Sequence, residues 1–158
     1  MRSCGILLYR YEADSGLAVW IGHMGGPFWA GKDAAAWSVP KGEPLPDETE
    51  LDAALREFAE EIGAPAPRAE YRRLGDFRQP SGKIVTVFAG EAEFGVERVS
   101  SNTFDLEWPP RSGRIGRFPE IDDAGWFPIE VARQKVVKGQ VRMLDALRER
   151  LEAGGAGP

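Results

Sequence analysis

Residues 56–63 read Arg-Glu-Phe-Ala-Glu-Glu-Ile-Gly, so Glu57, Glu60 and Glu61 place three carboxylates within five positions. Carboxylates three or four residues apart are neighbours on a helix and disfavour it by roughly a few tenths of a kcal/mol per pair. Arg56 can pair with Glu60, but a single guanidinium cannot neutralise three carboxylates. The octapeptide therefore predicts a further positive charge, and a hard divalent cation with oxygen ligands meets that need.

An amphipathic helix is expected around this octapeptide. Its apolar residues recur at helical spacing within an arc of roughly 100°: Leu51, Ala54, Leu55, Phe58 and Ile62. The glutamates occupy another arc, so the helix has a core face and an acidic face. Thr49 with Asp52 resembles a capping box at its start, and Gly63 supplies its end. A solvated acidic face is the alternative interpretation.

Residues upstream of the octapeptide complete a longer pattern. Gly42 is followed after five residues by Glu48, and after seven more by the run Arg56-Glu57-Phe58-Ala59-Glu60-Glu61-Ile62-Gly63-Ala64. These identities match every fixed position of the Nudix box, so the chain resembles the Nudix hydrolases. The lead-in over residues 37–42 is similar to that of the family, and residues 120–129 resemble a segment of its diadenosine polyphosphate branch.

The resemblance covers residues 3 to about 150 and implies a fold of the α/β class. That fold is the Nudix α/β/α sandwich around a mixed sheet, in which the box forms loop, helix and loop. We expect a single domain over residues 1–152 and a disordered tail over residues 153–158.

The resemblance also assigns the catalytic machinery. It implies that Mg²⁺, or Mn²⁺, is bound by Glu57, Glu60 and Glu61, with the backbone carbonyl near Gly42 as a further ligand. Glu120 is the candidate outside the box, as a ligand of a second metal or as the base that activates water; an exposed loop acid is its alternative. The family takes its base either from the box or from a later loop, so Glu57 and Glu60 stay open as catalytic residues.

Two further residues of the box have supporting roles. The resemblance implies that Arg56 orients the glutamates. Glu48 lies in the loop before the helix and is counted with the catalytic residues, because it can turn back toward the metal site. A brace between loop and helix is the alternative role for Glu48.

The residue types suit this chemistry independently of the resemblance. Phosphoryl substitution needs neutralised oxygens and a positioned, activated water, which carboxylate-held cations provide. A glutamate can remove the proton of that water, so the single histidine of the chain is no obstacle.

Substrate contacts are less firmly encoded. Cationic side chains that could contact phosphates are Lys41, Arg78, Lys83, Arg111, Arg114 and Arg117. Flat partners for a nucleobase are Trp29, Phe88 and above all Trp108, each with a core or lid role as the alternative. His23 could touch the substrate or be structural.

Composition excludes several classes of protein. A net charge of −5 argues against binding duplex nucleic acid, and one cysteine with one histidine excludes a disulfide framework and a Cys/His zinc site. The apolar run at residues 5–9 is too short for a signal peptide or a membrane span, so we expect a cytoplasmic protein without a membrane partner. The sequence leaves the oligomeric state open.

Secondary structure outside the box follows from periodicity and turn residues. Strands are expected at residues 4–9, 17–22, 37–39, 71–78, 84–92 and 125–127, and helices from about residue 130 and over residues 140–152. Residues 23–36, 41–47 and 95–119 are expected to be loops, because they are rich in glycine, proline and polar residues.

The expected function is metal-dependent hydrolysis of a pyrophosphate linkage in nucleoside polyphosphates by water attack on phosphorus. Dinucleoside polyphosphates such as diadenosine tetraphosphate are favoured by residues 120–129. The alternatives are a house-cleaning pyrophosphatase for oxidised or other nucleoside triphosphates and a catalytically silent nucleotide-binding regulator. Removal of RNA caps is a further option, disfavoured by the acidic balance of the chain.

Overall fold

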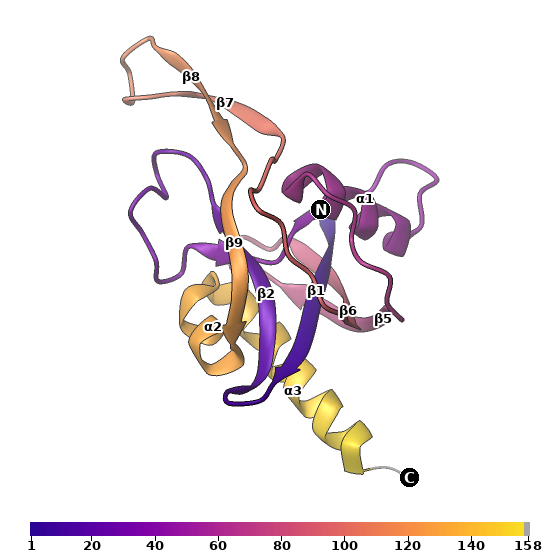
Figure 1. The fold of residues 1–158 in the computed structure, drawn as a ribbon. Helices are drawn as coiled ribbons and strands as arrows, with labels where there is room; N and C mark the ends of the chain where they lie inside the picture. Colours follow the sequence, from indigo (N-terminus) through magenta and orange to yellow (C-terminus); the bar gives the residue numbers. More distant parts are fainter. Residues whose placement is uncertain (157–158) are drawn as a thin grey trace.

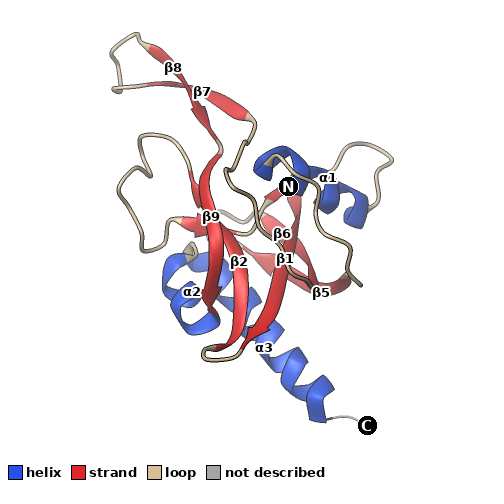
Figure 2. Cartoon of the chain, in the orientation of Figure 1, coloured by secondary structure: helices blue, strands red, loops and turns tan. Residues whose placement is uncertain are grey.

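The computed structural model describes residues 1–156, which form a mixed sheet with helices on both faces. Figure 2 shows the helices on either side of the strands. The strands are β1 (Arg2–Glu12), β2 (Gly16–Met24), β3 (Trp37–Ser38), β4 (Lys41–Gly42), β5 (Arg72–Arg78), β6 (Ile84–Glu91), β7 (Thr103–Glu107), β8 (Ile115–Pro119) and β9 (Ile121–Pro128). The helices are α1 (Glu50–Ile62), α2 (Ile129–Lys135), a 3₁₀ turn (Lys138–Gln140) and α3 (Val141–Ala156).

The main sheet has seven strands, in the order β3-β2-β1-β6-β5, with β4 pairing on β1 and β9 on β2. Strands β1 and β6 are parallel, and the other pairs in this sheet are antiparallel. The predicted antiparallel pair at residues 4–9 and 17–22 is therefore confirmed, as are the strands predicted at 71–78 and 84–92.

Alternation along the central strands sends successive side chains to opposite faces of the sheet. Leu7 and Val87 pack on one face with α2 and α3, whereas Ile6, Leu8 and Phe88 pack on the other face with α1. Each face thus has its own apolar layer, which explains the nearly continuous apolar runs of β1 and β6. The predicted α/β/α sandwich around a mixed sheet is confirmed.

The structure corrects the expected limits of several elements. Residues 41–42 form the short strand β4 inside a predicted loop, because they pair with Cys4 and Gly5 of β1. Strand β9 begins at Ile121 and is longer than predicted. Helix α3 continues to Ala156, four residues beyond the predicted end of the helix at residue 152. The disordered tail stays a prediction, and its last two residues lie outside the described residues.

The largest difference lies at residues 95–119, which were expected to be mostly loop. Strands β7 and β8 form a separate two-stranded ribbon there, with Phe104 opposite Phe118. Figure 1 shows this ribbon projecting from the main sheet, joined to it through β9. We call residues 103–119 the arm.

Candidate active site

Helix α1 begins and ends as its sequence predicts. Thr49 is its N-cap, and the side-chain oxygen accepts a hydrogen bond from the backbone N–H of Asp52 at 3.1 Å. Gly63 closes the helix at φ 87°, a left-handed conformation that glycine adopts without strain, and its N–H donates to the carbonyl of Ala59. The helix lies against β1 and β4, which brings its acidic face to one end of the sheet.

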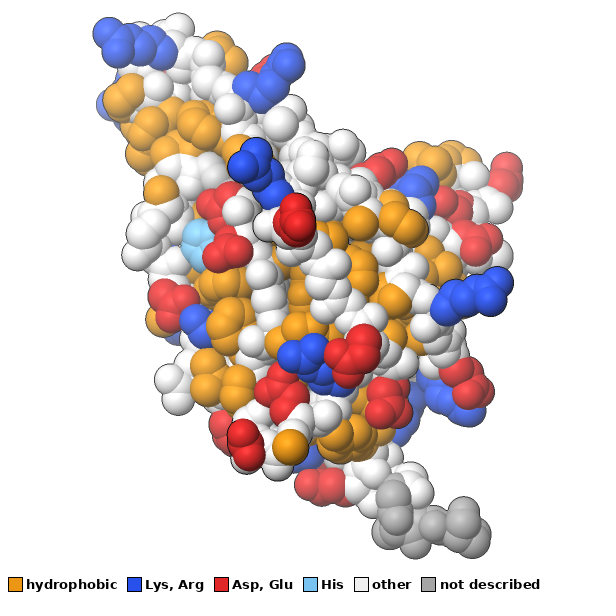
Figure 3. Space-filling model, viewed as in Figure 1, with side chains coloured by type: hydrophobic (Ala, Val, Ile, Leu, Met, Phe, Trp, Pro, Cys, Tyr) orange, Lys and Arg blue, Asp and Glu red, His pale blue; other side chains and the backbone are white. Residues whose placement is uncertain are grey.

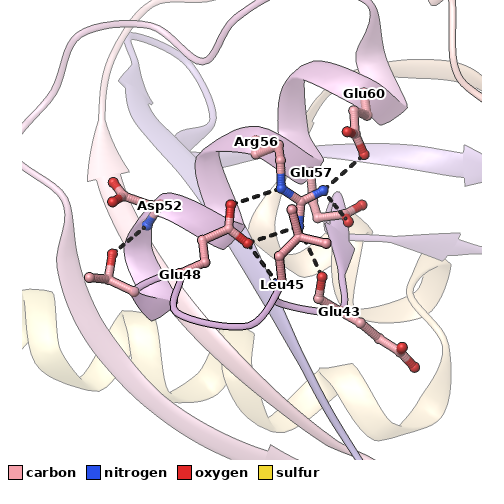
Figure 4. A network of polar contacts seen from close by, with 8 residues as sticks. Glu43, Leu45, Glu48, Asp52, Arg56, Glu57 and Glu60 are labelled. Carbon is pink, nitrogen blue, oxygen red and sulfur yellow. Dashed lines mark hydrogen bonds and ion pairs between the residues drawn. The ribbon is translucent and has the colours of Figure 1, made fainter.

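Arg56 organises the carboxylates of the box (Figure 4). Its guanidinium donates two hydrogen bonds to Glu48, at 2.8 and 3.0 Å, and single bonds to Glu57 at 2.8 Å and Glu60 at 3.1 Å. A fifth bond reaches the backbone carbonyl of Glu43. These bonds raise the pKa of Arg56, which stays charged. Arg56 therefore sets the position of three of the four acids in the box.

Glu48 is engaged on both carboxylate oxygens and faces Arg56. Its side chain also accepts from the backbone N–H of Leu45 at 2.9 Å. The hydrogen bonds from Arg56, followed by that from Leu45, lower the pKa of Glu48. This geometry agrees with a brace between loop and helix, which was the alternative interpretation of Glu48.

A cavity of ≈ 460 Å³ opens beside the acidic face of α1. The predicted residues that line it come from distant parts of the chain: Trp29, Lys41, Gly42, Glu57, Glu61, Lys83 and Glu120. Carboxylates and lysines thus share one concave surface, as expected of a site that handles phosphates through a cation.

Gly42 allows Glu57 to reach this cavity. A Cβ placed on Gly42 would lie 2.0 Å from Oε2 of Glu57 and 2.1 Å from its Cδ. Pairing of β4 with β1 fixes the backbone of Gly42, which cannot move away. Glycine is therefore required at this position so that the Glu57 carboxylate can lie over the strand.

Glu61 is the most deeply buried acid of the box, with 9% of its surface exposed. Burial raises its pKa to about 8, the bond from the backbone N–H of Lys41 at 3.1 Å opposes the shift, and the charges of Glu120 and Glu57 add to it. A carboxyl in such a place holds its proton near neutral pH until a cation replaces it.

Glu120 lies between β8 and β9 and is brought to the box by tertiary structure. Its backbone is fixed by hydrogen bonds with Gly25 and Asn102, both at 2.9 Å. Burial raises its pKa, as does the charge of Glu57, while Lys41 and a hydrogen bond with Glu61 oppose the shift. Glu120 therefore lines the same cavity as Glu57 and Glu61, although the residue itself is exposed, so its role at the metal and its role as an exposed loop acid both stay predictions.

Two lysines complete the cluster. Lys41 and Lys83 both line the cavity, although they belong to different strands or turns and lie far apart in the sequence. Burial lowers the pKa of Lys41, whereas the carboxylate of Glu61 opposes the shift. These ammonium groups therefore share the cavity with the acids.

Other predicted residues lie elsewhere. Glu60 is outside the lining and turns to Arg56, with 40% of its side chain exposed. Trp108, Arg111, Arg114 and Arg117 are on the arm and do not line the cavity, so the structure does not bring them to the carboxylates.

The remaining candidates have structural contacts or separate places. Phe88 packs in the core beneath α1. His23 contacts Asp122 of β9 through Nδ1 at 2.7 Å and the backbone carbonyl of Lys32 through Nε2 at 2.6 Å, so its ring links the loop at residues 25–36 to the sheet. Arg78 borders a different depression, which it shares with residues of the 3₁₀ turn.

Sequence reasoning missed several residues of the cavity, among them Ser3, Ser38, Glu43 and Phe104. The hydroxyl of Ser3 is buried and has no hydrogen-bond partner in the part of the chain that the structure describes. Neither serine has a local signature, since only the sheet brings them here. Phe104 had one, because it alternates with polar residues in Thr103–Glu107.

The donor set fits a hard divalent cation in chemistry, although it is not a ready-made centre. Over residues 1–156, no three acidic, histidine or cysteine side chains converge closely enough to form one. Arg56 draws Glu57 and Glu60 toward itself, which accounts for their separation. Carboxylate oxygens at a cavity where burial raises the pKa of Glu61 are the ligands that Mg²⁺ or Mn²⁺ prefers.

The family model described as NUDIX domain matches residues 2–147, and the chain belongs to this family. The resemblance seen in the box is thereby confirmed. Among solved structures, a C. elegans Ap4A hydrolase in a binary complex is similar with a TM-score of 0.68 and 18% identity, covering 96% of this chain and 98% of that one. The likeness at this identity shows the fold.

Two further similar proteins have names that state a different ligand or activity. The NUDIX domain of Shewanella oneidensis NrtR complexed with ADP ribose has a TM-score of 0.64 at 18% identity, covering 96% of this chain and 88% of the other. The mRNA-decapping protein g5R of African swine fever virus (isolate Warthog/Namibia/Wart80/1980) is 38% identical over 107 residues, which are 65% of this chain. The match spans 41% of the viral protein.

Within the described residues, no helix is both long and apolar enough to cross a membrane. The cytoplasmic location stays a prediction from the sequence.

Proposed function

We propose that this chain hydrolyses a pyrophosphate linkage in nucleoside polyphosphates, in a reaction that depends on Mg²⁺ or Mn²⁺. One observation carries the proposal: Glu57, Glu61 and Glu120 share a cavity with Lys41 and Lys83. The carboxylates would bind the metal ion, and the lysines beside them would bind the phosphate oxygens. The cavity therefore has binding groups for both parts of a metal–polyphosphate complex.

The metal would be held by the carboxylates of Glu57 and Glu61, with the nearby Glu60 completing the set. A bound divalent cation supplies charge neutralisation at the reacting phosphate and lowers the pKa of water. The carbonyl near Gly42 is a further proposed ligand. Arg56 fixes the directions of Glu57 and Glu60, because its guanidinium binds both, and Glu60 would have to turn from Arg56 toward the cavity to reach the cation.

The chain's own groups then divide the remaining work. Lys41 and Lys83 orient the polyphosphate and offset its charge. Glu120 is the proposed general base, because its raised pKa suits a carboxylate that takes a proton from water near neutral pH. Glu48 holds Arg56 through two bonds and acts by positioning.

Dinucleoside polyphosphates are the proposed substrate class, with diadenosine tetraphosphate as the first test. The likeness of residues 120–129 to that branch and the Ap4A hydrolase among similar structures support this class. Trp29 at the cavity edge is a flat partner available to a base. The house-cleaning pyrophosphatase and the silent regulator are the alternatives.

A second candidate function is removal of an RNA cap. The viral relatives, 38% identical over 107 residues, are named mRNA-decapping proteins, and this observation favours it. A capped RNA carries the same kind of pyrophosphate linkage that the cavity would bind.

A substrate panel with Mg²⁺ tests the proposal. It contains diadenosine tetraphosphate, nucleoside triphosphates including oxidised ones, and capped RNA, each scored by its products. We expect ATP with AMP from the first, and Glu61→Gln should lower turnover about a hundredfold or more, as loss of a metal ligand or base does. Glu149→Gln, at an exposed site on α3, is the matched control. Wild-type protein with no turnover on any substrate would favour the regulator.

A further inference from the structure

The arm is a ribbon that no other strand covers. Within the described residues, β7 and β8 pair only with each other. An isolated pair of strands is marginally stable in water, so other contacts must hold it. At the far end, the carboxylate of Glu107 accepts hydrogen bonds from the backbone N–H groups of Arg111 at 3.1 Å and Gly113 at 3.2 Å. The turn at the end of the arm is therefore built as a defined shape.

The root of the arm belongs to the catalytic cavity. Phe104 lines that cavity, and its ring fits against Gly26, where an added Cβ would lie 2.8 Å from it. Phe118 faces it across the ribbon, with 6.2 Å between ring centroids. A ligand that leaves the cavity at this side meets the arm first.

The register shows which side chains continue outward from the cavity. Residues opposite one another in a ribbon, and every second residue along a strand, share a face. Leu106 follows Phe104 on that face. Beyond it, the backbone N–H of Trp108 donates to the carbonyl of Arg114 at 2.9 Å, so these two residues lie opposite each other. One face of the arm therefore carries Phe104, Leu106, Trp108 and Arg114 from the cavity to the tip.

The tip is positively charged in an acidic protein. Arg111, Arg114 and Arg117 are exposed, and Figure 3 shows cationic side chains at the far end of the arm. Arg117 forms an ion pair with Asp105 at 3.4 Å. Over residues 1–156, neither Arg111 nor Arg114 has a carboxylate within ion-pair distance. Trp108, beside them, is 38% exposed.

From this arrangement we infer that the arm binds a single-stranded nucleotide chain whose 5′ polyphosphate occupies the cavity, as in an RNA 5′ end. The inference rests on the proposed hydrolysis of a pyrophosphate linkage. For the same site it favours the second candidate substrate, the 5′ end of an RNA, over a dinucleoside polyphosphate. Guanidinium groups suit phosphates, and an exposed indole suits the face of any base, which is how single strands are bound without sequence preference. A strand of five residues reaches about 17 Å, which is longer than one nucleotide.

A compact dinucleotide has no need of this length, whereas a chain extending from the cavity does. A second copy of this protein is the other possible occupant of the arm. The charge on the arm favours the nucleotide chain, since two unpaired guanidinium groups would lose their water in a protein interface without a phosphate to replace it.

The test compares Arg111→Ala/Arg114→Ala and Trp108→Ala with the wild type. The matched control is Arg68→Ala/Arg98→Ala, which removes the same charge from exposed sites elsewhere. The probes are a fluorescent RNA of about ten nucleotides with a 5′ triphosphate, a length that covers a typical single-strand site, and ATP. Binding is measured by anisotropy in Glu61→Gln background with Mg²⁺, at several salt concentrations, and KM is measured for both probes with the active protein.

We expect the arm variants to weaken RNA binding at least tenfold and to raise KM for RNA tenfold more than KM for ATP. Loss of two phosphate contacts should also lower the slope of log affinity against log salt by about 1.4. The control should match the wild type. Equal effects on RNA and ATP, or unchanged RNA binding, would overturn the inference.

Two further measurements distinguish failure of this inference from failure of the proposed function and from dimerisation through the arm. RNA binding through the arm by a protein that hydrolyses nothing would overturn the proposed function and leave the inference standing. Sedimentation of the wild type and the arm variants tests whether a second copy of the protein binds the arm. If only the wild type forms a dimer, and the variants bind RNA as the wild type does, the arm is a dimer interface and the inference is wrong.

Discussion

At the scale of single residues, the planar guanidinium of Arg56 sets the directions of the carboxylates in the box. It donates five hydrogen bonds: two to Glu48 and one each to Glu57, Glu60 and the backbone carbonyl of Glu43. A lysine would keep the charge, but its compact ammonium cannot span Glu48 and Glu57 in one plane. The guanidinium therefore contributes geometry that charge alone does not supply.

We predict that Arg56→Lys lowers kcat and the affinity for Mg²⁺ by roughly 10–100-fold, the range found when a residue that orients metal ligands is lost. Titrating activity against Mg²⁺ measures both quantities. Arg133→Lys, which alters a pair with Asp145 remote from the cavity, is the control. An unchanged kcat with an unchanged Mg²⁺ requirement would rule out this role for Arg56.

The sequence already contained this pattern at the residue scale, since the spacing of Arg56, Glu57, Glu60 and Glu61 is local. The sequence did not predict the direction in which each carboxylate points. Glu48 was expected to turn toward the metal or to act as a brace, and only the bonds to Arg56 and Leu45 favour the brace. Side-chain direction depends on partners that come from another segment, which periodicity does not report.

At the scale of elements, α1 is the best predicted part of the molecule. Its cap, its apolar stripe and its glycine end are signals within a few residues of one another, and each one is confirmed. Helices encode themselves in this way because their hydrogen bonds are local.

A prediction at this scale concerns the cap. Thr49→Ala removes the oxygen that accepts from Asp52, so we expect a loss of about 1 kcal/mol in the free energy of unfolding. The melting temperature should fall by about 2–4 °C for a chain of this length. Thr49→Ser keeps the acceptor and should melt like the wild type; identical melting of the Ala and Ser variants would show that the cap contributes nothing.

The arm is the element that the sequence did not predict. Thr103–Glu107 alternates as a strand should, but Ile115–Pro119 contains Gly116 and ends in proline, and both strands pair outside the main sheet. A ribbon without a core layer needs few apolar residues, so the usual hydrophobic signal is weak. Long-range pairing between its strands supplied the missing information.

At the scale of the whole molecule, the carboxylate cluster links stability to pH and to metal. The folded pKa of Glu61 is about 8, whereas its ordinary value is 4.5, and the pKa of Glu120 is raised as well. A raised carboxyl pKa means that the folded state holds protons which the unfolded state releases. The stability this represents is present below about pH 4.5 and is lost as pH rises toward 8.

We therefore predict that, in the presence of a chelator, the free energy of unfolding falls on the order of a few kcal/mol between pH 5 and 8. Urea unfolding at a series of pH values measures this change. Carboxylates with lowered pKa values, such as Glu48 and Asp145, complete their titration below that window and do not obscure it.

Two additions make the measurement specific. Saturating Mg²⁺ at pH 8 should restore about 2.7 kcal/mol at a hundred times its dissociation constant. Glu61→Gln should flatten the pH dependence, because an amide does not titrate. Stability that rises from pH 5 to 8 in the chelated wild type would contradict the raised pKa of Glu61.

The sequence by itself determined the class of this protein and the helix of the box and supplied the candidate ligands of a cation, because those signals are spacings within one short segment. Only the tertiary structure decided which distant residues join them. Lys83 and Glu120 reach the cavity through the pairing of β6 with β1 and of β9 with β2, whereas the arginines of the arm are carried away from it. The physical reason is that sheet register and chain crossing depend on contacts between segments far apart, and local periodicity holds no record of them.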